Sequence, residues 1–175
     1  MEVWILYGDD IESNADLAHE ARRFLKEGER MGVDLKIMKP SDFDLLVTQD
    51  SRDSILIKGK AVPLPDFVFP YFNHHDQGYF SLAIVRQLER LGVHVFNGAD
   101  VIETVRDKLH THQILAESGI HTPDTMLAKF PVDMKLVEDN IGFPVVVKTL
   151  NGALGIGVFL VETQGAFADL MELVG

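Results

Sequence analysis

Apolar runs and amphipathic stretches alternate over the first part of the chain. Residues 3–7 (VWILY) are apolar and lead into Gly-Asp-Asp, which is typical of a buried strand followed by a turn. Residues 13–31 place apolar side chains at helical spacing, with a capping-box start and a glycine just beyond the end. Residues 33–38 predict a second strand. This strand–helix–strand order predicts an α/β domain with parallel strands.

Further strands and a second helix follow. Residues 54–62 (SILIKGKAV) predict a small hairpin that turns at Lys58-Gly59-Lys60. Residues 66–72 predict a third core strand, and residues 76–91 carry apolar side chains on one helical face. Residues 93–96 predict a fourth strand. We therefore expect one parallel-sheet unit over residues 1–97.

The pattern changes after the turn at Asn97-Gly98, and residues 98–106 are the expected boundary of a second unit, residues 98–175. In that unit the pattern predicts helices over 107–117 and 133–141, strands over 125–130, 143–149 and 158–162, and a last helix from about residue 164. The chain as a whole is thus expected to contain two α/β units.

Composition and charge limit the partners. The chain has no cysteine, which excludes disulfides and thiolate metal sites and fits a reducing cytoplasm. No apolar run approaches the roughly 20 residues of a membrane-spanning helix, and the N-terminus lacks the basic start of a signal peptide. A formal net charge of −11 repels nucleic acid and anionic membranes, so neither is an expected partner. A nucleotide stays possible, because local lysines and backbone amides bind phosphate.

One segment, residues 145–161 (VVVKTLNGALGIGVFLV), carries candidate chemistry. It joins two apolar strands through a loop with Gly152, Gly155 and Gly157, and Lys148 lies near the end of the first strand. Glycines let backbone amides approach an anion, and a lysine adds a positive charge for phosphate oxygens. The order of the glycines and the strand–loop–strand context differ from the Rossmann and P-loop motifs. An ordinary hairpin with a solvated lysine explains the same pattern.

A second candidate is Arg106-Asp107-Lys108, which is predicted to open a helix after a turn. A cation at a helix start is unfavourable to the helix dipole. Lys108 is therefore either solvated or paired with a counter-anion.

Together these motifs resemble the RimK-type alpha-L-glutamate ligases of the ATP-grasp superfamily. The resemblance lies in NGADVIETVRDKLHTHQILAESGIHTPDT and IGFPVVVKTLNGALGIGVFLVET, and in the hairpin ILIKGKAVPLPDFVFP. It implies an α/β fold in which a pre-ATP-grasp parallel-sheet domain precedes the N-terminal lobe of an ATP-grasp fold. The C-terminal lobe of that fold is expected to be absent from this chain.

The resemblance also implies a reaction and a site. Lys108 and Lys148 would contact ATP phosphates, and Gly152, Gly155 and Gly157 would form a flexible lid. The implied activity is ATP- and magnesium-dependent ligation of an amino acid, with glutamate expected, to an amine acceptor through an acyl phosphate. The acceptor could be a protein or a peptide. The oligomeric state stays open, although a missing lobe would expose apolar surface on the last strands and favour a homo-oligomer.

The chain departs from this pattern in several places. Magnesium prefers carboxylate oxygens, and after the glycine loop only Glu162, Asp169 and Glu172 are available, at positions that form no cluster. No metal ligand and no catalytic residue is therefore assigned, and this chain alone is expected to be inactive. Asn151 and Tyr71 stand where relatives commonly carry an acidic residue and an arginine.

Other interpretations stay open. Asn73-His74-His75-Asp76, at the end of a predicted core strand, could touch substrate or could be exposed loop residues. The whole chain could belong to a non-catalytic nucleotide-binding or regulatory module, or to a different ATP-grasp amino-acid ligase.

Overall fold

The computed structural model describes residues 1–13, 16–47, 49, 54–72, 78–150 and 155–175. The chain divides into two compact units, Met1–Ile102 and Glu103–Gly175, and each is described by itself. The boundary between residues 97 and 98 stays a prediction. Among the described residues, no helix is both long enough and apolar enough to cross a membrane.

A four-stranded parallel sheet forms the centre of the first unit. Its strands, in spatial order, are β2 (Asp34–Met38), β1 (Glu2–Leu6), β6 (Phe67–Pro70) and β7 (His94–Val95). Every neighbouring pair is parallel. The parallel α/β unit predicted from the sequence is therefore confirmed, with β1 shifted by one residue from its apolar run and the other three strands shorter than predicted.

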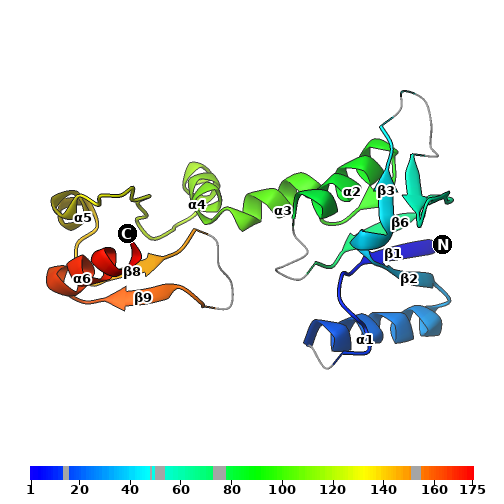
Figure 1. The fold of residues 1–175 in the computed structure, drawn as a ribbon, viewed down its shortest axis with the longest axis horizontal. Helices are drawn as coiled ribbons and strands as arrows, with labels where there is room; N and C mark the ends of the chain where they lie inside the picture. The colour runs from blue at the N-terminus through cyan, green and yellow to red at the C-terminus, as the bar shows by residue number, and fades with distance from the viewer. Residues whose placement is uncertain (14–15, 48, 50–53, 73–77, 151–154) are drawn as a thin grey trace. The chain divides into compact units, whose positions relative to one another are not determined.

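Two helices cover this sheet, one on each face (Figure 1): α1 (Asp16–Met31) and α2 (Tyr79–Arg90). Alternate residues of β1 supply both cores, because successive side chains of a strand point to opposite faces. Trp4 and Leu6 belong to the cluster that contains the buried residues of α2. Ile5 and Tyr7 belong to the cluster that contains Ala18 of α1. Burial on both faces explains why residues 3–7 are continuously apolar.

A small antiparallel sheet adjoins α2. It contains β3 (Phe43–Leu45), β4 (Ile55–Ile57) and β5 (Lys60–Ala61), and a short 3-10 helix, η1 (Pro40–Asp42), precedes it. Lys58 and Gly59 both have positive φ, 51° and 73°, as a two-residue hairpin turn requires. The hairpin predicted there is confirmed, whereas β3 was not predicted. The buried Gln87 of α2 donates to Ser54 Oγ at 2.7 Å, which ties this sheet to the helix.

The second unit contains a two-stranded sheet and short helices. The elements are α4 (Lys108–Glu117), α5 (Met134–Asn140), β8 (Val145–Lys148), β9 (Val158–Val161) and α6 (Gln164–Val174), and α3 (Ala99–Arg106) crosses the division between the units. Its buried core consists of Val137, Val161 and Phe167.

Residues 98–106, the expected boundary region, contain the helix α3, and the division between Ile102 and Glu103 falls within this range. One expectation for this region is wrong. Residues 125–130 form no strand, and among the described residues no strand pairs with them. Strand propensity is weak without a partner whose backbone completes the hydrogen bonds, which explains this error.

Candidate functional site

The glycine-containing segment forms an antiparallel hairpin. Strand β8 pairs with β9 in the register Val145↔Val161 to Lys148↔Val158. One further hydrogen bond, from Thr149 N to Gly157 O at 3.1 Å, closes the loop beyond the last strand pair. The predicted strand–loop–strand arrangement is confirmed, and Lys148 lies at the point where the chain leaves the sheet.

The two faces of the hairpin have different surroundings. Val145 and Val147 pack against the core that contains Phe167. Since paired residues share a face and neighbours alternate, Lys148 lies on the other face with Val146, Val158 and Leu160. The last three are 50%, 48% and 67% exposed. Lys148 itself is exposed, so this face presents one cation beside an apolar strip.

The described part of the loop needs glycine at two positions. Gly155 and Gly157 have φ values of +77° and +73°, in the left-handed region that other residues rarely adopt. At Gly157 space is short as well, because an added Cβ would lie 2.8 Å from Thr149 Oγ1. At Gly155 an added Cβ would meet none of the described residues within 4 Å. Gly152 and Asn151 lie outside the described residues.

Lys108 lies next to this loop although it is far from it in sequence. Asp107 is the N-cap of α4, and its side chain accepts a hydrogen bond from His110 N at 2.9 Å. Lys108 then opens the helix, and its Nζ donates to Leu150 O at 3.1 Å. The structure thus gives Lys108 a backbone carbonyl as a hydrogen-bond partner. The two arrangements expected from the sequence were solvation and a counter-anion. The contact joins the start of α4 to the loop that follows Lys148.

Lys108, a predicted site residue, therefore contacts the segment that follows Lys148, at Leu150. The sequence could not reveal Leu150 as a partner of Lys108, because the contact uses its main-chain oxygen and any residue supplies one. The close approach of Thr149 to Gly157 was also not predicted from the sequence, because it depends on which residues of the two strands pair.

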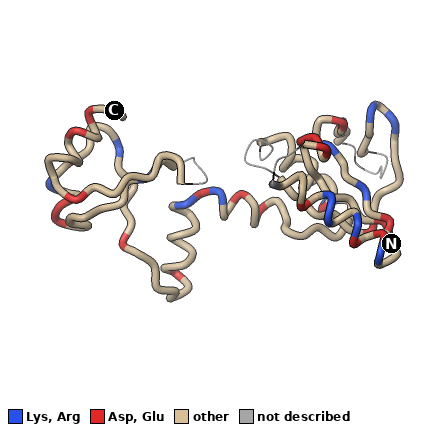
Figure 2. The backbone as a smooth tube through the Cα atoms, turned by 90° about the horizontal axis from the view of Figure 1, so that it is seen from below, with Lys and Arg blue, Asp and Glu red and all other residues tan. Residues whose placement is uncertain are grey.

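The charges of the chain are dispersed. Figure 2 shows acidic and basic residues interspersed along the backbone, without one long basic segment. Within the part of the chain that the structure describes, no group of three or more His, Asp and Glu side chains could hold a metal ion. The three acidic residues that follow the glycine loop form no such group, so they do not fit a magnesium site on their own: Glu162, Asp169 and Glu172.

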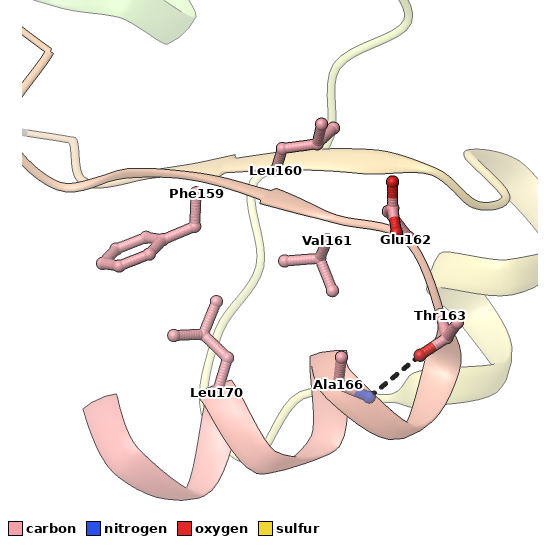
Figure 3. A pocket seen from close by; sticks show the side chains of 7 residues that line it. All are labelled: Phe159, Leu160, Val161, Glu162, Thr163, Ala166 and Leu170. Carbon is pink, nitrogen blue, oxygen red and sulfur yellow. Dashed lines mark hydrogen bonds between the residues drawn. The ribbon is translucent and has the colours of Figure 1, made fainter.

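A hollow of about 460 Å³ lies beside β9 and α6 (Figure 3). Phe159 and Val161 point toward α6 there, where Leu170 faces them, and Leu160 points to the opposite side of the strand. Its lining is mainly apolar, with Glu162 as its only charged residue. Lys148 belongs to the opposite face of the hairpin, so this hollow is separate from the candidate phosphate site.

The remaining candidates lie in the first unit. Asn73-His74-His75-Asp76 lie outside the described residues. Tyr71 stacks on Phe69 with ring centroids 5.6 Å apart, and its hydroxyl donates to Glu20 Oε2. A phenol bound to a carboxylate supplies no positive charge, so Tyr71 does not replace an arginine at this position.

Solved structures define the class of fold. The chain aligns over 99% of its length with a RimK domain ATP-grasp protein from Sphaerobacter thermophilus, at 19% identity and a TM-score of 0.65, and covers 60% of that protein. It also aligns over 99% of its length with D-alanine–D-alanine ligase from Bacillus anthracis, at 19% identity and a TM-score of 0.67, and covers 53% of that enzyme. The chain has the fold of ATP-grasp proteins over about half of their length.

Sequence comparison gives the family. Residues 1–102 match the RimK PreATP-grasp domain, and residues 105–174 match the RimK-like ATP-grasp domain. The chain belongs to the RimK family of ATP-grasp proteins, which confirms the resemblance and the predicted fold class.

Curated relatives agree with this assignment. A probable alpha-L-glutamate ligase 1 from Shewanella denitrificans is 34% identical over 163 residues, covering 93% of this chain and 55% of the relative. A probable alpha-L-glutamate ligase from Trichodesmium erythraeum is 31% identical over 155 residues, covering 88% of this chain and 51% of the relative. The chain spans about half the length of the curated relatives it matches.

The geometry of the loop generates a first prediction. Gly157→Ala should destabilise the closed end of the hairpin more than Gly155→Ala. Both changes place a Cβ at positive φ, at a cost of roughly 1–2 kcal/mol each, but only the change at position 157 also brings a Cβ against Thr149.

Hydrogen exchange of the Thr149 amide measures this effect, because that amide is bonded to Gly157 O. Exchange should be faster in Gly157→Ala than in Gly155→Ala. Equal exchange rates in the two variants would show that the Thr149–Gly157 contact does not hold the loop.

Proposed function

We propose that the protein is an ATP-dependent ligase that joins an amino acid, with glutamate the first candidate, to an amine acceptor through an acyl phosphate. The hydrogen bond from Lys108 to Leu150 carries the structural part of this proposal, because it brings a second lysine to the glycine loop. Relatives named probable alpha-L-glutamate ligase support the choice of glutamate. The D-alanine–D-alanine ligase fold supports ligation as the type of reaction.

The residues around the loop suit a nucleotide. Lys148 and Lys108 supply positive charge for the phosphates, and the loop with Gly155 and Gly157 supplies backbone close to them. The apolar strip beside Lys148, formed by Val146, Val158 and Leu160, suits the flat face of a nucleobase. Gly152 is proposed to belong to the same lid.

The proposed reaction has two steps. A carboxylate oxygen attacks the terminal phosphorus of ATP, ADP leaves, and an acyl phosphate forms. An amine then attacks the carbonyl carbon, phosphate leaves, and the nitrogen loses a proton to give an amide. Phosphoryl transfer depends mainly on positioning and electrostatic stabilisation, which is the role proposed for the two lysines.

Magnesium is part of the proposal only for the whole protein. The described residues provide no set of metal ligands, so no step is derived through the metal here. Its ligands, and any residue that contacts the acceptor, are proposed to belong to a part of the fold that this chain does not include. The 175-residue chain by itself is accordingly proposed to lack turnover.

The role of Lys148 generates the second prediction. Lys148→Ala should raise the dissociation constant for ATP roughly 10- to 100-fold, because a charge-assisted hydrogen bond is lost. Isothermal titration calorimetry measures this constant. Lys135→Ala is the matched control, because Lys135 is an exposed lysine of the same unit whose Nζ is paired with Asp139 at 2.6 Å on α5. Equal affinities of the two variants for ATP would refute the phosphate role of Lys148.

The third prediction concerns the reaction itself. The protein at its encoded length, given magnesium, ATP and each amino acid in turn, should release ADP in a glutamate-dependent manner. The 175-residue chain, measured in parallel, should release none above background, and the Lys148→Ala variant should release less than the parent at the same subsaturating ATP concentration. ATP binding without ADP release for any amino acid would contradict the ligase proposal and favour a non-catalytic nucleotide-binding module.

A further inference from the structure

The helices α3 and α4 are separated by a single residue that is not helical. Helix α3 ends at Arg106, α4 begins at Lys108, and Asp107 between them has φ −84° and ψ 103°. Such a break leaves the last carbonyls of the first helix without the amide donors that a continuous helix would supply. The joint from Thr104 to Thr111 lies wholly within the second unit.

The hydroxyl of Thr111 occupies this break. Its Oγ1 lies 3.0 Å from Thr104 O, in the last turn of α3, and 2.9 Å from Asp107 O. A hydroxyl has one proton, so it donates to one of these carbonyls at a time. In a continuous helix the amide of residue 108 would bond to Thr104 O. The hydroxyl of Thr111, a residue of the next helix, therefore takes the place of the missing main-chain donor to Thr104 O.

The bond to Thr104 distinguishes this contact from an ordinary feature of helices. Threonine hydroxyls often bond to the carbonyl four residues earlier in their own helix, as Thr111 does with Asp107. Thr104 is seven residues earlier and belongs to a different helix. The contact thus ties the last turn of α3, which lies within the second unit, to the first turn of α4.

We propose that Thr111 is a positioning residue for nucleotide binding, acting through Lys108. Lys108 is the first residue of α4, one turn before Thr111, and its Nζ reaches Leu150 O at the glycine loop. The bond between Thr111 and Thr104 spans the break on both sides of Lys108, so it restrains the backbone from which the Lys108 side chain starts. Thr111 itself touches no phosphate. This inference rests on the proposed function, in which Lys108 contacts the phosphates of ATP.

The test compares Thr111→Val, which keeps the shape but loses the hydroxyl, with Thr111→Ser, which keeps the hydroxyl. Both are made in the protein at its encoded length, alone and together with Lys108→Ala. Calorimetric titration with ATP in the presence of magnesium gives the dissociation constants. Far-UV circular dichroism checks that each variant folds. If the helix signal of Thr111→Val falls, Thr111→Ala is used in its place, because alanine is a good helix former.

Thr111→Val should weaken ATP binding roughly 3- to 10-fold, the effect of one hydrogen bond. Thr111→Ser should bind like the parent. In the Lys108→Ala background, Thr111→Val should cause no further loss, because residues that act through one another are not additive.

Three results would overturn the inference. If Lys108→Ala weakens binding and Thr111→Val does not, the proposed function stands and the role of Thr111 fails. If Thr111→Val weakens binding equally with and without Lys108, its effect does not pass through Lys108. If Lys108→Ala leaves ATP affinity unchanged, the phosphate role of Lys108 fails, and the inference fails with it.

Discussion

The hydrogen bond from Lys108 Nζ to Leu150 O joins segments 42 residues apart in the chain. The proposed nucleotide site depends on it, because this bond connects the helix start that carries Lys108 to the loop that follows Lys148. A lysine at a helix start opposes the helix dipole, and a carbonyl oxygen is a partner that offsets part of this cost without a bound anion. In the proposed function the same lysine also binds a phosphate oxygen, since an ammonium group has three donors.

The surroundings of this bond are held by local constraints. Asp107 caps α4 and so ends the continuous helix before Lys108, and Thr111 restores a donor to the interrupted turn. On the other side, Thr149 pairs with Gly157, and the hairpin register keeps Lys148 on the face away from the core. In the proposed function, these contacts hold the described part of the backbone beside the phosphates before nucleotide binds, which would limit the entropy lost on binding.

Much of this fold follows from the sequence, and the exceptions have physical causes. The strand over residues 3–7 was predicted because burial on both faces requires an unbroken apolar run. The strand expected over 125–130 is absent because a strand also needs a partner strand, which the sequence of residues 125–130 does not specify. Helix α3 was missed because its end runs into a second helix, with no glycine or proline to mark the change. The lysines and glycines were proposed as site residues from their residue types, whereas main-chain partners such as Leu150 O carry no residue signature.

The most direct test of the account is amide hydrogen exchange of the protein with and without saturating ATP. The account predicts slower exchange in two segments at once, residues 108–111 at the start of α4 and residues 155–158 at the end of the glycine loop. Amides of α1 in the first unit should exchange at unchanged rates and serve as the internal reference. Protection confined to the first unit, or slower exchange in only one of the two segments, would contradict a phosphate site shared by Lys108 and the glycine loop.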